Sequence, residues 1–134
     1  IPHYPVTDLQ WIEDRFWIWM HYGTTKLGRG ELFEVIDMLT YVRGVVLGPL
    51  AALKHGHDPR GARRLETIAK PELPALIATH AAYDRVDCGR ALQASATLYR
   101  QLREAVAPNI LRRTAAEHAA LHYLEAIIQR PAQQ

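Results

Sequence analysis

Apolar residues recur every three or four positions along most of this chain, which is the spacing of one face of an α-helix. The first such stretch begins after Thr7 or Asp8, either of which can cap a helix. It ends near Leu27, where Gly28-Arg29-Gly30 stops it. The expected core stripe of this first helix consists of Leu9, Ile12, Phe16, Trp19, Met20, Gly23 and Leu27.

A second apolar stripe begins at Glu31, whose negative charge favours a helix N-terminus. Its members are Leu32, Val35, Ile36, Leu39, Val42, Val46 and Leu50. We expect the Gly48-Pro49 pair to kink or break this helix, because proline lacks the N–H that an inner turn needs. The segment from His55 to Gly61 has the glycine and proline residues typical of a loop.

The second half of the chain predicts two short helices, over about 62–69 and 71–82, and two longer ones. Asp84 caps a helix that runs to about Val106, and the last runs from about Thr114 to Gln129. Their inward residues are expected to be Val86, Ala91, Ala94, Leu98, Leu102 and Val106, then Leu121, Leu124, Ile127 and Ile128. No strand or hairpin pattern occurs. The sequence therefore predicts an all-α fold, an antiparallel bundle of four to five helices over residues 8–130, with a linker at 1–7 and a tail at 131–134.

Composition narrows the classes of partner. The net charge is +2 and no run of Lys or Arg exceeds two residues, so nucleic acid is not an expected partner. A single cysteine, Cys88, excludes an internal disulfide, suits a cytoplasmic protein and is expected to be a packed thiol. No apolar stretch is expected to reach the roughly 20 residues of a membrane span. The chain opens on Ile1 and a proline-containing segment, which indicates a linker and a domain cut from something longer.

One flank of the first helix carries candidate binding chemistry. Arg15, Trp19, Tyr22 and Lys26 follow the helical spacing i, i+4, i+7 and i+11. Two cations and two aromatic rings on one flank can grip a phosphate and stack a ring. The same pattern also fits a core tryptophan with the cations extending past its edge.

The segment from Arg15 to Leu32, RFWIWMHYGTTKLGRGEL, resembles the start of the C-terminal helical domain of aminoglycoside nucleotidyltransferase-like proteins. The likeness covers roughly residues 10–47 and is architectural beyond them. It implies that Lys26 lies near nucleotide phosphates, with Arg29 as a weaker phosphate contact. It also implies that Tyr22, Trp19 and Arg15 contact the ligand, with the aromatic residues lining an acceptor pocket.

The resemblance further implies that the catalytic half is a separate N-terminal domain of the same chain, with a Gly-Ser turn and paired aspartates that bind magnesium. Ser95 is the only serine here and no Asp-x-Asp occurs. We therefore expect this domain to be catalytically inactive alone. Its expected partners are the N-terminal catalytic domain and a small-molecule acceptor. The nucleoside triphosphate and Mg²⁺ are expected to bind only when the catalytic domain is present. The general base stays unassigned, because Glu13 lies across the core stripe from Lys26 and Glu31 favours the helix start.

Two other functions remain open at this point. In a HEPN-type helical ribonuclease, an arginine precedes a histidine by a few residues, as Arg113 precedes His118 and Arg15 precedes His21. The histidine would then act as acid or base while the arginine stabilises the transition state. Alternatively, the chain is a helical dimerisation module. Three large apolar residues fall outside the core stripe, namely Trp11, Trp17 and Ile18. They suggest a contact surface, which in this interpretation would join two copies of the chain as a homodimer.

Histidines raise the question of a metal site. His118, His122 and Glu125 share one stripe of the last helix, and His55, His57 and Asp58 lie in a loop. Two imidazoles four residues apart can bind zinc, but a third ligand is needed. His118 to His122 also lacks the glutamate of a zinc-protease motif. We interpret the stripe as a solvated helix face and expect no metal.

Overall fold

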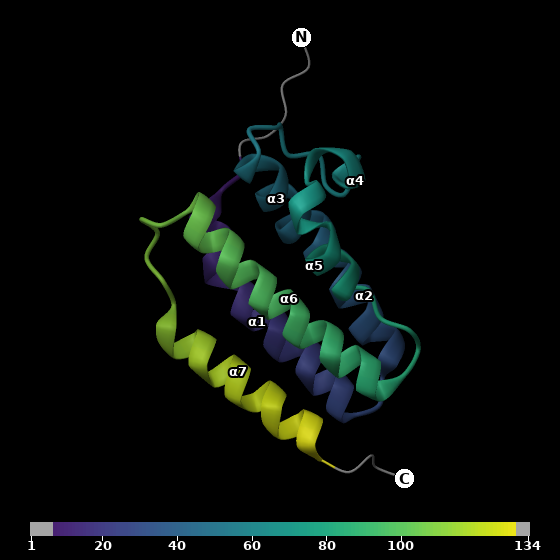
Figure 1. Cartoon of the computed structure of the whole chain (residues 1–134). Coiled ribbons are helices and arrows are strands. Elements are labelled where there is room, and N and C mark those ends of the chain that lie inside the picture. Colours follow the sequence, from purple (N-terminus) through teal and green to yellow (C-terminus); the bar gives the residue numbers. More distant parts are fainter. Residues whose placement is uncertain (1–6, 131–134) are drawn as a thin grey trace.

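A computed structural model describes residues 7–130, and all regular secondary structure in that range is helical (Figure 1). The elements are α1 (Leu9–Gly28), α2 (Leu32–Val42), the π-helical turn η1 (Arg43–Leu47), α3 (Gly48–Lys54), α4 (Leu65–Ile68), the 3-10 turn η2 (Lys70–Glu72), α5 (Leu73–Ala78), α6 (Arg85–Val106) and α7 (Thr114–Gln129). The predicted all-α bundle is confirmed. Apart from Thr7, the predicted linker at 1–7 and tail at 131–134 lie outside the described residues.

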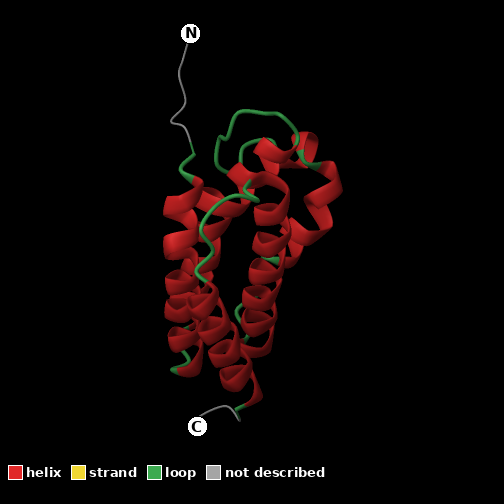
Figure 2. Ribbon diagram, turned by 90° about the vertical axis from the view of Figure 1, so that its left-hand side faces the viewer, coloured by secondary structure: helices red, strands yellow, loops and turns green. Residues whose placement is uncertain are grey.

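The long helices lie along one common axis (Figure 2), with α1 and α7 running in one direction and α2 and α6 in the opposite one (Figure 1). Gly23, late in α1, lies against Leu92, early in α6, so these two helices are antiparallel. The hydroxyls of Thr25 in α1 and Tyr123 in α7 are 3.1 Å apart, near the ends of both helices. α7 therefore lies beside α1 in the same direction, and α6 packs against α1, α2, α3 and α5.

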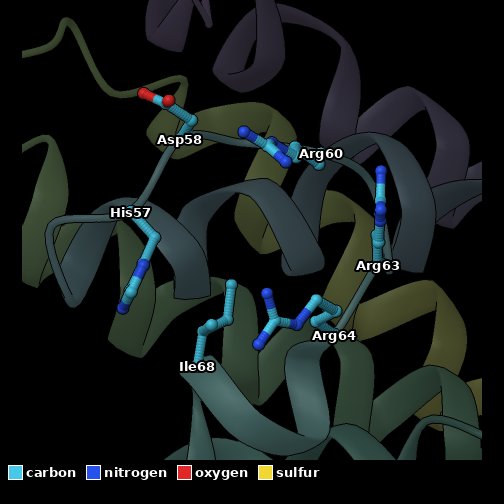
Figure 3. Close-up of a pocket in the computed structure, with 6 residues that line it drawn as sticks. All are labelled: His57, Asp58, Arg60, Arg63, Arg64 and Ile68. Atoms are coloured by element: carbon cyan, nitrogen blue, oxygen red, sulfur yellow. The ribbon is translucent and has the colours of Figure 1, made fainter.

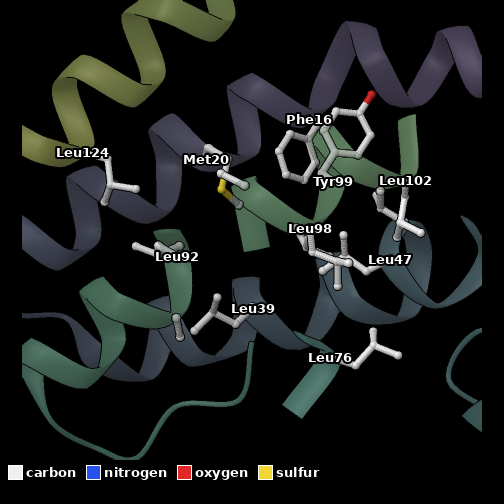
Figure 4. Close-up of a cluster of buried hydrophobic side chains, with 14 of the residues drawn as sticks. Phe16, Met20, Leu39, Leu47, Leu76, Leu92, Leu98, Tyr99, Leu102 and Leu124 are labelled. Atoms are coloured by element: carbon white, nitrogen blue, oxygen red, sulfur yellow. The ribbon is translucent and has the colours of Figure 1, made fainter. Parts of the chain in front are cut away.

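The core lies between α1, α2 and α6 and extends to α7 (Figure 4). Phe16 and Tyr99 stack at its upper end with ring centroids 3.9 Å apart. Met20 and Leu92 continue the core toward Leu124 of α7. The buried Cys88 thiol has a pKa raised by burial, as suits the packed thiol that the sequence predicts.

Two expectations about burial are wrong. Trp17 is 2% exposed rather than part of a free surface, whereas Trp11 and Ile18 are 37% and 63% exposed, as predicted. α1 contacts α2, α6 and α7, so its buried arc is wider than a single stripe. Val86, expected to point inward, is 79% exposed because it lies in the first turn of α6, before the buried positions that begin at Cys88.

The Gly48-Pro49 pair does not break the second helix. The chain continues from α2 through η1 into α3, and the Gly48 N–H bonds to the Arg43 carbonyl five residues earlier. This wider turn stands just before Pro49, which occupies the first turn of α3. A Cβ on Gly48 would lie 2.3 Å from the Gly61 carbonyl oxygen, so glycine is needed here for the loop backbone to approach.

The continuous stretch Leu32–Lys54 has 23 residues and a mean hydropathy of 1.4 in its most apolar part, enough by length and composition to cross a membrane. The expectation that no stretch reaches that length is therefore wrong. Of that most apolar part, 56% is buried inside the bundle, and a core helix meets the same two criteria. Its hydropathy follows from packing, since Val35, Leu39 and Val42 are all buried.

Candidate functional site

Lys26 projects from α1 toward the first turns of α2. Its Nζ lies 2.7 Å from a carboxylate oxygen of Glu34 and 3.5 Å from one of Glu31. The Tyr22 hydroxyl donates to the other Glu34 oxygen at 3.1 Å. These hydrogen bonds raise the pKa of Lys26 and lower the pKa of Glu34, so both groups stay charged over a wide pH range. The cation predicted to meet phosphates thus has two carboxylate partners, Glu34 and Glu31.

Arg15 and Trp19 belong to a row of aromatic contacts along α1. Arg15 donates to the Trp11 carbonyl at 3.2 Å, and its guanidinium lies 4.5 Å from the centroid of the Trp11 ring. Trp19 meets Trp11 edge-on at 5.6 Å and Tyr41 of α2 at 5.1 Å. The structure therefore keeps these two predicted residues close together. Arg29 lies apart in the turn after α1.

Arg29 pairs with a carboxylate oxygen of Glu31 at 3.5 Å and is exposed. Glu31 is the N-cap residue of α2, yet its side chain makes no capping hydrogen bond. The carboxylate forms ion pairs with Lys26 and Arg29 instead. The expectation that Glu31 simply favours the helix start therefore misses these two ion pairs.

A hollow of about 420 Å³ lies between α1 and α2. Its lining residues are Tyr22, Glu34, Asp37, Met38 and Tyr41. Asp37 is exposed, and in residues 7–130 no ion pair or hydrogen bond engages its carboxylate. Carboxylates next to aromatic rings attract ammonium groups, both by charge and by cation–π interaction. The α2 contribution was missed from the sequence, although positions 34, 37, 38 and 41 have the spacing of one helix face.

Glu13, the weak candidate for a general base, is fully buried beneath α6 and α7. Tyr99 donates to it at 2.6 Å, the backbone N–H of Arg113 at 2.8 Å and Arg103 at 3.2 Å. Burial raises the pKa of Glu13, but these hydrogen bonds outweigh it and the pKa is lowered. A buried carboxylate with this many donors orders the bundle and has no access to a substrate.

The structure also places the residues of the two other predicted constellations. Arg113 pairs with Asp14 at 2.8 Å, while His118 is exposed further along α7. His55 meets a carboxylate oxygen of Glu72 at 2.6 Å. His122 is exposed on α7, and among the described residues no group of three His, Cys, Asp or Glu is placed to hold a metal ion.

A second hollow, of about 170 Å³, lies where the loop after α3 meets α4 (Figure 3). Its lining residues are His57, Asp58, Arg60, Arg63, Arg64 and Ile68. From the sequence, this stretch is predicted to be a loop followed by a short helix, with His57 and Asp58 considered only as metal ligands. The signal available there was three arginines within five positions.

Comparison of the chain with known protein families, with curated proteins and with solved structures finds no match. The features of the chain that bear on its function are therefore the two hollows and the resemblance of residues 15–32.

Proposed function

We propose that this chain is the acceptor-side helical domain of a nucleotidyltransferase-like protein, and that the hollow between α1 and α2 binds an amine-bearing acceptor. The resemblance of Arg15 to Leu32 supports the first part. The second part rests on one observation, which is the Asp37 carboxylate beside the rings of Tyr22 and Tyr41. Magnesium and the nucleoside triphosphate belong to the catalytic domain that the resemblance implies.

The charges around the hollow favour an amine over a neutral hydroxyl compound. Lys26 balances Glu34 at 2.7 Å, which leaves Asp37 as the lining carboxylate without a counter-ion in the described part of the chain. An ammonium group placed there gains a carboxylate in a hollow that is also lined by the aromatic side chains of Tyr22 and Tyr41. A neutral sugar hydroxyl gains a hydrogen bond without that attraction.

In this role the domain contributes position rather than proton transfer. Holding an acceptor in a fixed geometry beside a reacting nucleotide accelerates a two-substrate reaction without any charged catalytic group on the holding side. The ring contacts from Trp11 through Trp19 to Tyr41 form an aromatic wall that ends at Tyr41, one of the residues lining the hollow. Lys26 keeps Glu34 and Tyr22 in place at that wall.

Binding is tested by titrating the chain with glucosamine and, as its neutral counterpart, N-acetylglucosamine. The Trp19 indole N–H signal in a ¹⁵N NMR spectrum reports on the hollow, because Trp19 contacts Tyr41. We expect a saturable shift with glucosamine only, and at least fivefold weaker binding in Asp37→Asn. Asp58→Asn makes the same charge change elsewhere and should bind as the parent chain does. Equal shifts from both sugars, or unaltered binding in Asp37→Asn, would refute the amine site.

The nucleotidyltransferase part has a separate test in the reading frame upstream of Ile1. A Gly-Ser turn followed by an Asp-x-Asp motif would support it. A start codon directly before Ile1 would refute it and direct attention to ribonuclease activity, assayed with Arg113→Ala and His118→Ala.

A further inference from the structure

The arginine hollow beside α4 has a strong excess of positive charge. Arg63 and Arg64 are exposed, and within residues 7–130 neither forms an ion pair with a carboxylate. Asp58 is the single acid among the lining residues, and Figure 3 shows its carboxylate turned away from Arg64 and His57. By contrast, Lys26, Arg103 and Arg113 each have a carboxylate partner. The charges of Arg63 and Arg64 are therefore without a carboxylate partner among the described residues.

The loop that carries these arginines is held against the helix behind it. The Gly61 carbonyl oxygen sits so close to Gly48 that a Cβ on Gly48 would be 2.3 Å away, and a Cβ on Gly61 would lie 3.5 Å from the Gly44 carbonyl oxygen. Gly61 itself has a φ of +61°, which suits glycine. At Gly61, the backbone that presents Arg60, Arg63 and Arg64 thus packs directly on η1 and α3.

Arg64 also has an unusual backbone conformation. Its φ of 61° and ψ of 23° lie in the left-handed region, and it is the one non-glycine residue with positive φ in the described chain. Such conformations cost free energy and cluster at binding and catalytic positions. The consequence here is that the Arg64 guanidinium extends across the start of α4 beside Ile68, facing the hollow (Figure 3).

We propose that this hollow binds a phosphate group, held by Arg63 and Arg64 with an N–H of His57. Arginine presents a planar fork of donors that matches phosphate oxygens, and a neutral or protonated imidazole can add another. The volume, about 170 Å³, is below that of pockets for drug-sized ligands, so it suits one or two phosphate groups rather than a whole nucleotide. This site is separate from the amine hollow, and either can fail while the other holds.

The test measures binding of inorganic pyrophosphate, and separately of ATP, to the 134-residue chain by calorimetry in 0.15 M salt without divalent metal. The loop variant is Arg63→Gln with Arg64→Gln. The matched control, Arg100→Gln with Arg112→Gln, removes the same charge from two exposed arginines that have acidic partners. Melting curves of all three chains confirm that each is folded.

We expect saturable pyrophosphate binding that weakens at least tenfold in the loop variant and less than threefold in the control. Similar affinities for pyrophosphate and ATP would show that the site recognises the phosphate chain alone. Tighter binding of ATP that is still lost in the loop variant would show that the site binds a nucleotide through its phosphates. Absence of saturable binding to the parent chain, or equal losses in both variants, would overturn the proposal.

Discussion

The guanidinium of Arg103 donates to both carboxylate oxygens of Glu13, at 3.2 and 3.3 Å. The same nitrogen donates to Glu117 at 2.6 Å, so one cation on α6 joins an acid on α1 to an acid on α7. All three side chains are buried. Tyr99 completes the cluster, because burial and its bond to Glu13 raise the pKa of this phenol and keep it a donor.

Replacing Arg103 by methionine should destabilise the bundle by about 3–5 kcal/mol, since it leaves Glu13 buried without a cation and Glu117 with only the exposed Arg100. Arg100 is a matched control on the same helix. It also pairs with Glu117, at 3.2 Å, but is 55% exposed, so Arg100→Met should cost less than about 1 kcal/mol. Urea unfolding of the two variants measures the difference. Equal losses would mean that the buried cluster contributes no more than a surface pair.

Stability should fall in acid through Glu13 and Glu72. Burial raises the pKa of both carboxyl groups, but hydrogen bonds lower each pKa by more than burial raises it. For Glu72, these hydrogen bonds come from Lys54 and His55. A lowered folded-state pKa contributes stability that is complete above the ordinary glutamate pKa of about 4.3 and disappears as the pH falls through the folded value. Glu72→Gln should therefore show a shallower loss of melting temperature between about pH 5 and pH 3. An unchanged slope would contradict this assignment.

The helices were predictable from sequence because their caps and stripes are local signals. Asp8 and Asp84 accept from backbone N–H groups in the first turns of α1 and α6, as their positions predict. The sequence did not predict correctly how deeply some side chains are buried, because burial depends on how many other helices pack against a given helix. Trp17 and Glu13 are buried because α1 faces both α6 and α7, and periodicity along one helix does not report that number.

The candidate site was predictable in part. The α1 side, with Tyr22 and Lys26, follows from spacing, and its α2 partners Asp37 and Tyr41 follow only once the two helices are paired. The arginine hollow was not predictable, because it depends on the close contact of Gly61 with Gly48 and on the left-handed backbone of Arg64. Those are tertiary features that have no periodic signal in the sequence.

Gly48 and Gly44, four residues apart on the same helical stretch, should respond oppositely to alanine. A Cβ at Gly48 would collide with the Gly61 carbonyl oxygen, whereas at Gly44 nothing lies within 4 Å. Gly48→Ala should destabilise the chain by about 1–3 kcal/mol, as overpacking does, and should loosen the arginine loop. Gly44→Ala should be neutral or stabilise by up to about 1 kcal/mol through helix propensity. Thermal unfolding separates the two, and similar costs would place the strain elsewhere.

Arg64→Gly should make the chain more stable and bind phosphate less well. Glycine relieves the left-handed backbone at a φ of 61°, a gain of about 1 kcal/mol, and removes the guanidinium at the same time. Arg63→Gly removes the same charge from the same turn but lies outside the left-handed region, so it should lose up to about 1 kcal/mol. Both should weaken pyrophosphate binding. Opposite stability changes with a shared loss of binding would show that the strain at Arg64 is retained for binding, whereas a stability loss in Arg64→Gly would show that its guanidinium serves the fold instead.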